Sequence, residues 1–238
     1  MYNRTPSKAI EFSKTYHVEH AQSIGELAKK SRIIVTVLLD DDAVKKVCSQ
    51  LSDVIAPGQI VVEMSTITPL VSIELARSFS MKGARLLDAP VLGTPLALRN
   101  GSASIVVGGD ANAFNDVNAI LEGITKNVAY IGENGSGLHC KLMNNLLVAS
   151  YLIALDEAVD FGLGEGLKTE VIEKILTSFS SARTPISTVR VPNMLKGVRS
   201  NPSTDKNIRK DTMIIESEAE RMKLKLPLTR FTAGMYRE

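Results

Sequence analysis

Hydrophobic positions follow two different periodicities along the chain. In residues 1–131, short runs rich in β-branched and aliphatic side chains alternate with segments whose apolar residues recur at helical spacing. The runs predict strands at 32–39, 60–64, 84–91, 102–109 and 127–132. The segments between them predict helices at 41–51, 68–83 and 111–124. Strand–helix alternation of this kind indicates an α/β layered domain with a mainly parallel sheet.

Beyond Gly137 the pattern becomes helical. Residues 169–179 and 205–224 each carry apolar side chains along one helical face, and no segment of 138–238 has a convincing strand pattern. A long segment that begins near Gly137 is apolar on almost every side, which is typical of a helix buried in protein. We therefore expect an α/β domain over 1–134 and an all-helical domain over 135–238, joined by this long helix.

Composition excludes several classes of protein. The 238 residues are 44% hydrophobic and 23% charged with a net charge of +2, which indicates a neutral cytoplasmic protein with no bulk attraction to nucleic acid or a membrane. Amides and carboxylates interrupt the longest apolar run, so we expect no membrane span. The spacing of two cysteines and three histidines predicts neither a disulfide framework nor a metal site.

Lys141 and Asn145 stand four positions apart at the head of the long apolar segment. That spacing places both side chains on one face of a helix, one turn apart. Partial burial would lower the pKa of such a lysine toward neutrality, where it can act as a general acid or base beside an amide that orients a substrate oxygen. A lysine with its stem on apolar surface and its head in water is the alternative, which the spacing alone slightly favours.

Two further stretches suggest binding sites. In DAPVLGTP, residues 88–95, a strand leads into a loop where the backbone amides of Gly93 and Thr94 could receive a carboxylate. Proline and glycine that merely shape a crossover loop are the alternative. Near the start, Asn3, Arg4 and Thr5 suit a turn that binds the 2′-phosphate of a dinucleotide, although a solvated tail is the default for such a tripeptide.

Five segments in the same order carry a resemblance to a known family. They are YNRTPSKA at the start, EMSTITP at 63–69, DAPVLGTP with the later GSASIVVGG, GLHCKLMNNL at 137–146 and KDTMIIESEAERMKLKLP at 210–227. With these segments the chain resembles, over essentially its whole length, the β-hydroxyacid dehydrogenase family. That family includes 3-hydroxyisobutyrate dehydrogenase, tartronate semialdehyde reductase and relatives of 6-phosphogluconate dehydrogenase.

The resemblance implies a fold and a catalytic centre. The expected fold is a Rossmann domain, NADP-binding, over 1–134, followed by an all-α domain for substrate binding and dimerisation over 135–238. Lys141 matches the family's catalytic lysine, and Asn145 matches the asparagine that helps hold the substrate. Gly93 and Thr94 fall in the loop that receives the substrate carboxylate.

The resemblance also implies a cofactor site. Asn3, Arg4 and Thr5 match the turn that accommodates the 2′-phosphate, so NADP is expected, with NAD as the weaker alternative. Leu38 and Leu39 sit where the family's chain skirts the adenosine half. Ser65 and Thr66 fall near the nicotinamide. Lys210 belongs to a lysine–aspartate pair that lines the cleft, in which Asp211 is expected to organise its helix.

The implied function is NADP-dependent, reversible hydride transfer between a small β-hydroxy acid and its semialdehyde or keto form. A homodimer or homotetramer built through the helical domain is expected. Imine reduction on the same fold is disfavoured, because those relatives usually replace the lysine that Lys141 matches.

Two departures from the family pattern shape these expectations. Leu92 and Thr94 stand where many members carry serine and glycine, which affects the identity of the substrate. No GxGxxG precedes Asn3, so the first strand, glycine-rich turn and helix of the Rossmann unit are expected to be missing. We therefore expect the chain to be a fragment or shortened product of a longer enzyme. The alternative is a non-catalytic binding or dimerisation module derived from the family.

Overall fold

The computed structural model describes residues 1–199 and 202–237 and divides the chain into two compact units. The first unit is Met1–Lys141 and the second is Leu142–Glu238. A continuous helix, α7 (Ser136–Gly164), contains the point at which the units meet in the sequence.

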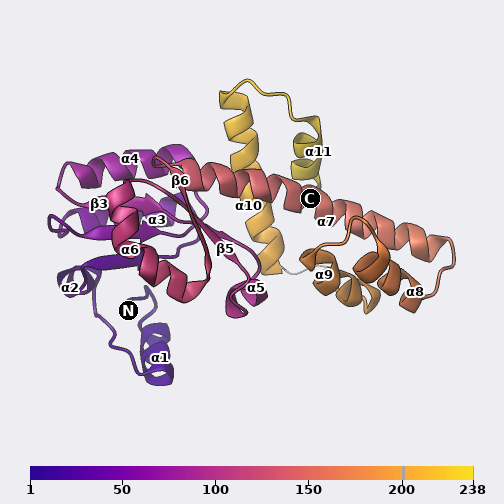
Figure 1. The fold of residues 1–238 in the computed structure, drawn as a ribbon, viewed down its shortest axis with the longest axis horizontal. Coiled ribbons are helices and arrows are strands. Elements are labelled where there is room, and N and C mark those ends of the chain that lie inside the picture. The colour runs from indigo at the N-terminus through magenta and orange to yellow at the C-terminus, as the bar shows by residue number, and fades with distance from the viewer. Residues whose placement is uncertain (200–201, 238) are drawn as a thin grey trace. The chain divides into compact units, whose positions relative to one another are not determined.

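The first unit is built on a six-stranded sheet (Figure 1). Its strands are β1 (Ile33–Thr36), β2 (Ile60–Glu63), β3 (Arg85–Asp88), β4 (Val91–Leu92), β5 (Ser104–Gly108) and β6 (Asn127–Gly132). They lie in the order β1-β2-β3-β5-β4, and β6 also pairs with β5. The neighbours β1, β2 and β3 run parallel, as do β5 and β6, whereas β5 is antiparallel to β3 and β4. The sheet is therefore mainly parallel, as the alternating pattern predicts.

The predicted strand over 84–91 is interrupted in the structure. β3 ends at Asp88, and the chain resumes as the short strand β4 at Val91. Pro90, between them, has no N–H to give to a sheet ladder, which favours a break at this point. Residues 89–94 therefore form a connection at the carboxyl end of β3, called here the loop of residues 89–94, which contains the two-residue strand β4.

Six helices of the first unit precede α7 in the sequence, either before the first strand or between the strands. They are α1 (Pro6–Tyr16), α2 (Ile24–Lys29), α3 (Asp41–Ser52), α4 (Pro69–Ser80), α5 (Pro95–Arg99) and α6 (Ala111–Ile124). Two predicted helices begin at aspartate caps, because Asp40 accepts the Ala43 N–H at 3.0 Å and Asp110 accepts the Ala113 N–H at 2.8 Å. The third predicted helix, α4, begins with a proline at its first position, where a missing N–H costs nothing.

Apolar side chains cover both faces of the sheet. Along β2, Val61 packs into one core cluster, whereas Ile60 and Val62 pack into the other. Leu86 and Leu87 of β3 divide in the same way. Successive side chains of a strand point to opposite faces, so this division shows a sheet buried on both sides, as parallel sheets require.

The regular secondary structure of the second unit, over its described residues, is entirely helical. Besides the C-terminal part of α7, it contains α8 (Thr169–Lys174), the π-helical segment η1 (Ile175–Phe179), α9 (Pro185–Leu195), α10 (Pro202–Arg221) and α11 (Pro227–Met235). Leu155 and Val159 of α7 pack with Ile172, Val191 and Met194 in its core cluster.

The long helix is less buried than its composition predicts. Met143, Leu147 and Phe161 of α7 are 66%, 66% and 71% exposed in the single chain. The helix therefore buries only part of its apolar surface within this chain. Among the described residues, none of the helices has both the length and the apolar character needed to cross a membrane.

The first turn of α7 packs tightly against the sheet at Gly137. A Cβ added there would lie 2.7 Å from the Val106 carbonyl oxygen and 2.8 Å from that of Asp88. These neighbours are backbone atoms of two strands, so they cannot rotate away as a flexible side chain could. Only a residue without a side chain lets α7 begin at this distance from β3 and β5.

Gly137→Ala is expected to lower the free energy of unfolding by about 1–3 kcal/mol, because the added methyl group overpacks the junction. Gly123→Ala is the matched control, since Gly123 lies near the end of α6 with nothing within 4 Å of an added Cβ. Alanine there should stabilise the protein by up to about 1 kcal/mol. Urea denaturation of both variants checks this pair. Equal effects in the two variants would show that the junction is not tightly packed.

Candidate active site

Asp88, the last residue of β3, is fully buried and holds the start of α7. Its Oδ1 atom accepts the backbone N–H of Gly135 at 2.7 Å, and its Oδ2 atom accepts that of Leu138 at 3.1 Å. The first N–H groups of a helix have no partner within the helix and carry the positive end of its dipole, so a carboxylate there satisfies both needs. Asp88 therefore fixes the end of the sheet to the beginning of the helix.

Lys141 lies one turn further along α7 and contacts the loop that follows Asp88. Its Nζ atom donates a hydrogen bond to the carbonyl oxygen of Val91 at 2.7 Å. The half-buried lysine is thus held beside the loop of residues 89–94, two positions from Gly93. The sequence predicted the lysine and the loop as separate features, and the structure brings them together.

Gly93 and Thr94 have structural roles within that loop. Gly93 adopts a φ of +147°, and an added Cβ would lie 3.0 Å from the Cβ of Ala103. The Thr94 hydroxyl accepts the backbone N–H of Ala97 at 3.1 Å and so caps α5. Both residues are exposed. The glycine therefore lets the loop pack on Ala103, and the threonine side chain is already engaged by the cap.

Within the second unit, Asn145 belongs to a chain of polar contacts. Its Nδ2 atom donates to Oδ2 of Asp211 at 2.6 Å, and its Oδ1 atom accepts from Nδ2 of Asn144 at 3.0 Å. Lys210 Nζ lies 3.1 Å from the other Asp211 oxygen, in an ion pair that lacks hydrogen-bond geometry. Asp211 is 7% exposed, so it holds the Asn145 amide in one orientation from a buried position.

A small cavity adjoins this group. It has a volume of about 50 Å³ and is lined by Asn145, Val148, Ile208 and Asp211. Such a volume holds about one or two water molecules, so it is too small for a substrate by itself. Asn145 and Asp211 both line the cavity and are hydrogen-bonded to each other. The spacing of residues along the sequence did not predict this contact.

A second buried carboxyl group, that of Glu63, lies at the carboxyl ends of β1 and β2 and contacts residues at both ends. Glu63 accepts the Thr36 hydroxyl at Oε2 and the Ser65 backbone N–H at Oε1, the latter at 2.7 Å. The Ser65 hydroxyl in turn accepts the backbone N–H of Leu38 at 2.7 Å. Ser65 is only 3% exposed, so its side chain supports the neighbouring loop from within.

The remaining residues predicted to bind a cofactor differ in exposure. Leu38 packs against the core cluster that also contacts Tyr2, whereas Leu39 is 47% exposed and Thr66 is half-buried. Asn3 Oδ1 accepts the backbone N–H of Thr5 at 2.9 Å and so shapes the turn before α1. Arg4, in the middle of that turn, is exposed. The turn is therefore organised by Asn3 and leaves the Arg4 cation at the surface.

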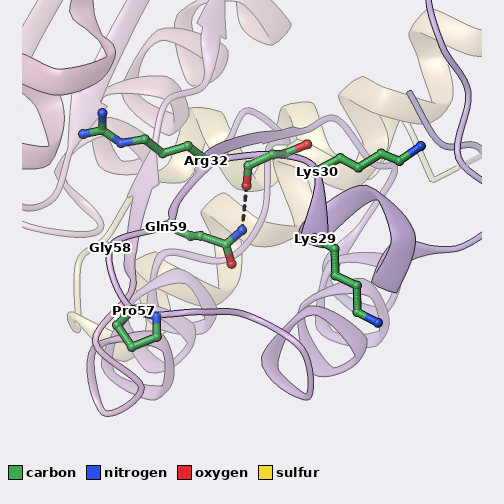
Figure 2. A pocket seen from close by; sticks show the side chains of 7 residues that line it. Lys29, Lys30, Arg32, Pro57, Gly58 and Gln59 are labelled. Carbon is green, nitrogen blue, oxygen red and sulfur yellow. Dashed lines mark hydrogen bonds between the residues drawn. The ribbon is translucent and has the colours of Figure 1, made fainter.

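A broad, open hollow in this unit lies at the opposite end of the strands. It has a volume of about 550 Å³ and is lined by residues 29–32 and 57–59, which precede β1 and β2 (Figure 2). Figure 2 shows the side chains of Lys29, Lys30 and Arg32 pointing in different directions. Lys30 pairs with Glu26 at 3.1 Å and Arg32 with Asp116 at 3.1 Å. Ligands of open α/β sheets bind at the carboxyl ends of the strands, so this hollow is not the candidate site.

Other kinds of centre find no support in the described part of the chain. No group of three or more histidine, cysteine, aspartate or glutamate side chains there could hold a metal ion. Cys48 is buried, and burial raises the pKa of its thiol to about 12. Cys140 is also free.

Fold and site together define a two-part protein, with a dinucleotide-binding type of α/β unit and a helical unit that begins within the lysine-bearing helix. Residues 1–132 match the family described as the NAD binding domain of 6-phosphogluconate dehydrogenase. Residues 135–238 match the NAD-binding domain of NADP-dependent 3-hydroxyisobutyrate dehydrogenase. The chain belongs to the β-hydroxyacid dehydrogenase family.

Individual relatives agree with this assignment. The chain is 33% identical over 205 residues to the mitochondrial 3-hydroxyisobutyrate dehydrogenase of Mus musculus, covering 84% of this chain and 61% of the mouse enzyme. It is 30% identical over 247 residues to 2-hydroxy-3-oxopropionate reductase of Escherichia coli, covering 93% and 82%. The crystal structure of 3-hydroxyisobutyrate dehydrogenase from Salmonella typhimurium has the same fold, with a TM-score of 0.87 at 22% identity over 99% of this chain and 83% of that one. The chain thus spans about three fifths of the length of the mouse relative.

Burial raises the pKa of both buried carboxyl groups. For Asp88, desolvation outweighs the N–H groups of Gly135 and Leu138, which act in the opposite direction. For Glu63, desolvation outweighs the hydrogen bonds from Ser65 and Thr36. Each folded carboxyl group therefore holds its proton to a higher pH than it does in the unfolded chain.

The Glu63 shift predicts a pH dependence of stability. Above the unfolded pKa of roughly 4.3, the unfolded chain releases the proton that the folded chain still binds, so stability falls as pH rises through the folded pKa. Glu63→Gln cannot titrate. We expect the unfolding free energy of wild type minus that of Glu63→Gln to be most favourable near pH 4 and to decline toward neutral pH. Urea denaturation across this range measures the difference, and a value that rises with pH would show that the folded carboxyl pKa is lowered.

Proposed function

We propose that this chain is a 3-hydroxyisobutyrate dehydrogenase-type oxidoreductase. Its reaction would be NADP-dependent, reversible hydride transfer between a small β-hydroxy acid and its semialdehyde or keto form. The single observation that carries the proposal is the hydrogen bond from Lys141 to Val91, because it holds an ammonium group beside the loop at the carboxyl end of β3. The matches to a 6-phosphogluconate dehydrogenase domain and an NADP-dependent 3-hydroxyisobutyrate dehydrogenase domain support it.

Lys141 is the proposed proton donor and acceptor. In the direction of reduction, its ammonium group gives a proton to the substrate oxygen as negative charge develops there. In the direction of oxidation, the neutral amine takes the hydroxyl proton. The carbonyl of Val91 orients Nζ without neutralising it, since a carbonyl oxygen accepts a hydrogen bond but carries no full charge.

Asn145, Gly93 and Thr94 are the proposed substrate-binding residues. The Asn145 amide, held by Asp211 at 2.6 Å, would orient the reacting oxygen. Backbone amides of Gly93 and Thr94 would receive the carboxylate, because the Thr94 side chain is engaged in capping α5. Leu92 stands where many members of the family carry serine, so this loop lacks that hydroxyl, which affects the identity of the substrate.

The proposed cofactor is NADP, which supplies or accepts the hydride when bound. The residues present fit the adenosine end of such a group: Arg4 is an exposed cation suited to a 2′-phosphate, and the exposed Leu39 side chain offers apolar surface to an adenosine. Asn3 and Thr5 would shape the phosphate-binding turn around Arg4. Leu38, Ser65, Thr66 and Lys210 complete the proposed cofactor-binding set.

The proposed setting is a cytoplasmic homodimer or homotetramer that acts on small hydroxy acids or semialdehydes. Exposed Met143, Leu147 and Phe161 on α7 support assembly, because apolar side chains of this size gain free energy when a partner covers them. Sedimentation velocity measures the assembly, and a monomer at all accessible concentrations would contradict it.

Lys141→Ala should lower turnover by about 100-fold or more, because general acid–base catalysis contributes roughly that factor. The dissociation constant of NADPH should change little. Lys141→Arg should also fail, since an arginine side chain keeps its proton at neutral pH. Lys126→Ala, which removes an exposed lysine of the same unit, is the matched control and should retain full turnover. Turnover of the wild type and the three variants is measured as NADPH formed from NADP with 3-hydroxyisobutyrate, and as NADPH consumed with 2-hydroxy-3-oxopropionate. Near-normal turnover in Lys141→Ala would overturn the assignment.

A further inference from the structure

Glu63 closes a ring of hydrogen bonds between the two loops that follow β1 and β2. One carboxyl oxygen accepts the Thr36 hydroxyl, and the other accepts the Ser65 backbone N–H at 2.7 Å. The Ser65 hydroxyl then accepts the Leu38 backbone N–H at 2.7 Å, which returns the ring to the chain two residues after Thr36. A backbone bond from Met64 to the Thr36 carbonyl, at 2.9 Å, crosses the same gap.

The ring is buried and spans the last rung of the parallel pair. Thr36 and Glu63 are direct register partners at the ends of β1 and β2. Their exposed fractions are 7% and 1%, and that of Ser65 is 3%. Burying a carboxyl group at this position costs free energy that an aliphatic pair would not. The carboxyl group offsets this cost by accepting hydrogen bonds from the last residue of β1 and from the backbone just after β2.

We propose that Glu63 is a positioning residue that holds residues 37–39 and 64–66 in one fixed relation and thereby sets the affinity for the dinucleotide. The inference rests on the proposed function, which places Leu39 and Thr66 at the cofactor. Glu63 itself is buried and acts through its neighbours. With Leu38 drawn to Ser65 and packed on the core, the next side chain, Leu39, turns to the surface.

The role depends on hydrogen bonding rather than on charge. A glutamine at position 63 keeps an oxygen for the Ser65 N–H, and its amide group can donate to the Thr36 hydroxyl, which accepts as well as donates. A leucine offers neither acceptor and leaves two buried donors without partners. Glu63→Gln should therefore preserve the ring, whereas Glu63→Leu should break it.

Amide hydrogen exchange followed by NMR tests the positioning directly. Glu63→Leu should lower the protection of the Leu38 and Ser65 amides by about 10-fold or more, because each loses a buried partner or its support. Glu63→Gln should stay within about 3-fold of wild type at both amides. Gly135 and Leu138, whose amides are held by Asp88, are the internal reference and should not change.

A second pair of variants covers the case in which Glu63→Leu does not fold. Thr36→Val removes the hydroxyl of the ring at nearly constant shape, whereas Thr36→Ser keeps it. The valine variant should lower protection at Leu38 and Ser65, and the serine variant should restore it. Unchanged protection at Leu38 in both Glu63→Leu and Thr36→Val would overturn the inference. So would an equal loss at Gly135 and Leu138, since that result reports general destabilisation.

NADPH titration of the same folded variants tests the link to the cofactor. Glu63→Leu or Thr36→Val should raise the dissociation constant by about 10-fold, and Glu63→Gln and Thr36→Ser should restore it. Loosened loops with unchanged affinity would overturn the link. Failure of the wild-type chain to bind NADPH would count against the proposed function and the link alike, and the exchange measurement would still decide the positioning role.

Discussion

The first unit depends on the pair of hydrogen bonds that connects the Asp88 carboxyl group to the backbone at the start of α7. A carboxylate at the end of β3 receives two N–H groups from the start of a helix of 29 residues, and both partners are buried. Each of those N–H groups would otherwise be an unpaired donor in the interior, at a cost of roughly 1–3 kcal/mol. Gly137 allows the approach, since any side chain there would strike the backbone of the strands. These hydrogen bonds also determine the position of Lys141, because the lysine lies on the next turn of the same helix.

The two buried carboxyl groups of the sheet fulfil the same physical function at different strands. Asp88 connects the end of β3 to the start of α7, and Glu63 connects the end of β1 to the segment that follows β2. In a parallel sheet the ladder ends at the carboxyl edge, where the chain must leave the strands and still keep a defined shape. Each carboxyl group accepts hydrogen bonds from two donors at or just beyond that edge. Both raised pKa values follow from this arrangement, since the same burial that makes the contacts rigid removes water from the acid.

Much of the fold follows from local pattern, whereas the supports of the site do not. The predicted helix at 111–124 is α6, and the predicted strand at 127–132 is β6, because periodicity and capping residues lie within each segment. Lys141 was a candidate from its spacing to Asn145. Its partner Val91 is 50 positions away, and Asp88 contacts residues 47 and 50 positions away, so no local pattern pairs them. The sequence predicted only that Glu63 lies in a strand. Its position opposite Thr36 follows from the parallel register of β1 and β2.

Equilibrium titration of the purified chain with NADPH and with NADH decides whether the chain binds a dinucleotide and which of the two it prefers. Arg4 is exposed in a turn shaped by Asn3, and a charge-assisted bond to a phosphate stabilises a complex by enough for roughly tenfold in affinity. We therefore expect saturable binding of both dinucleotides, with NADPH bound at least about tenfold more tightly. Absence of saturation by either dinucleotide at millimolar concentration would contradict a dehydrogenase built on this chain.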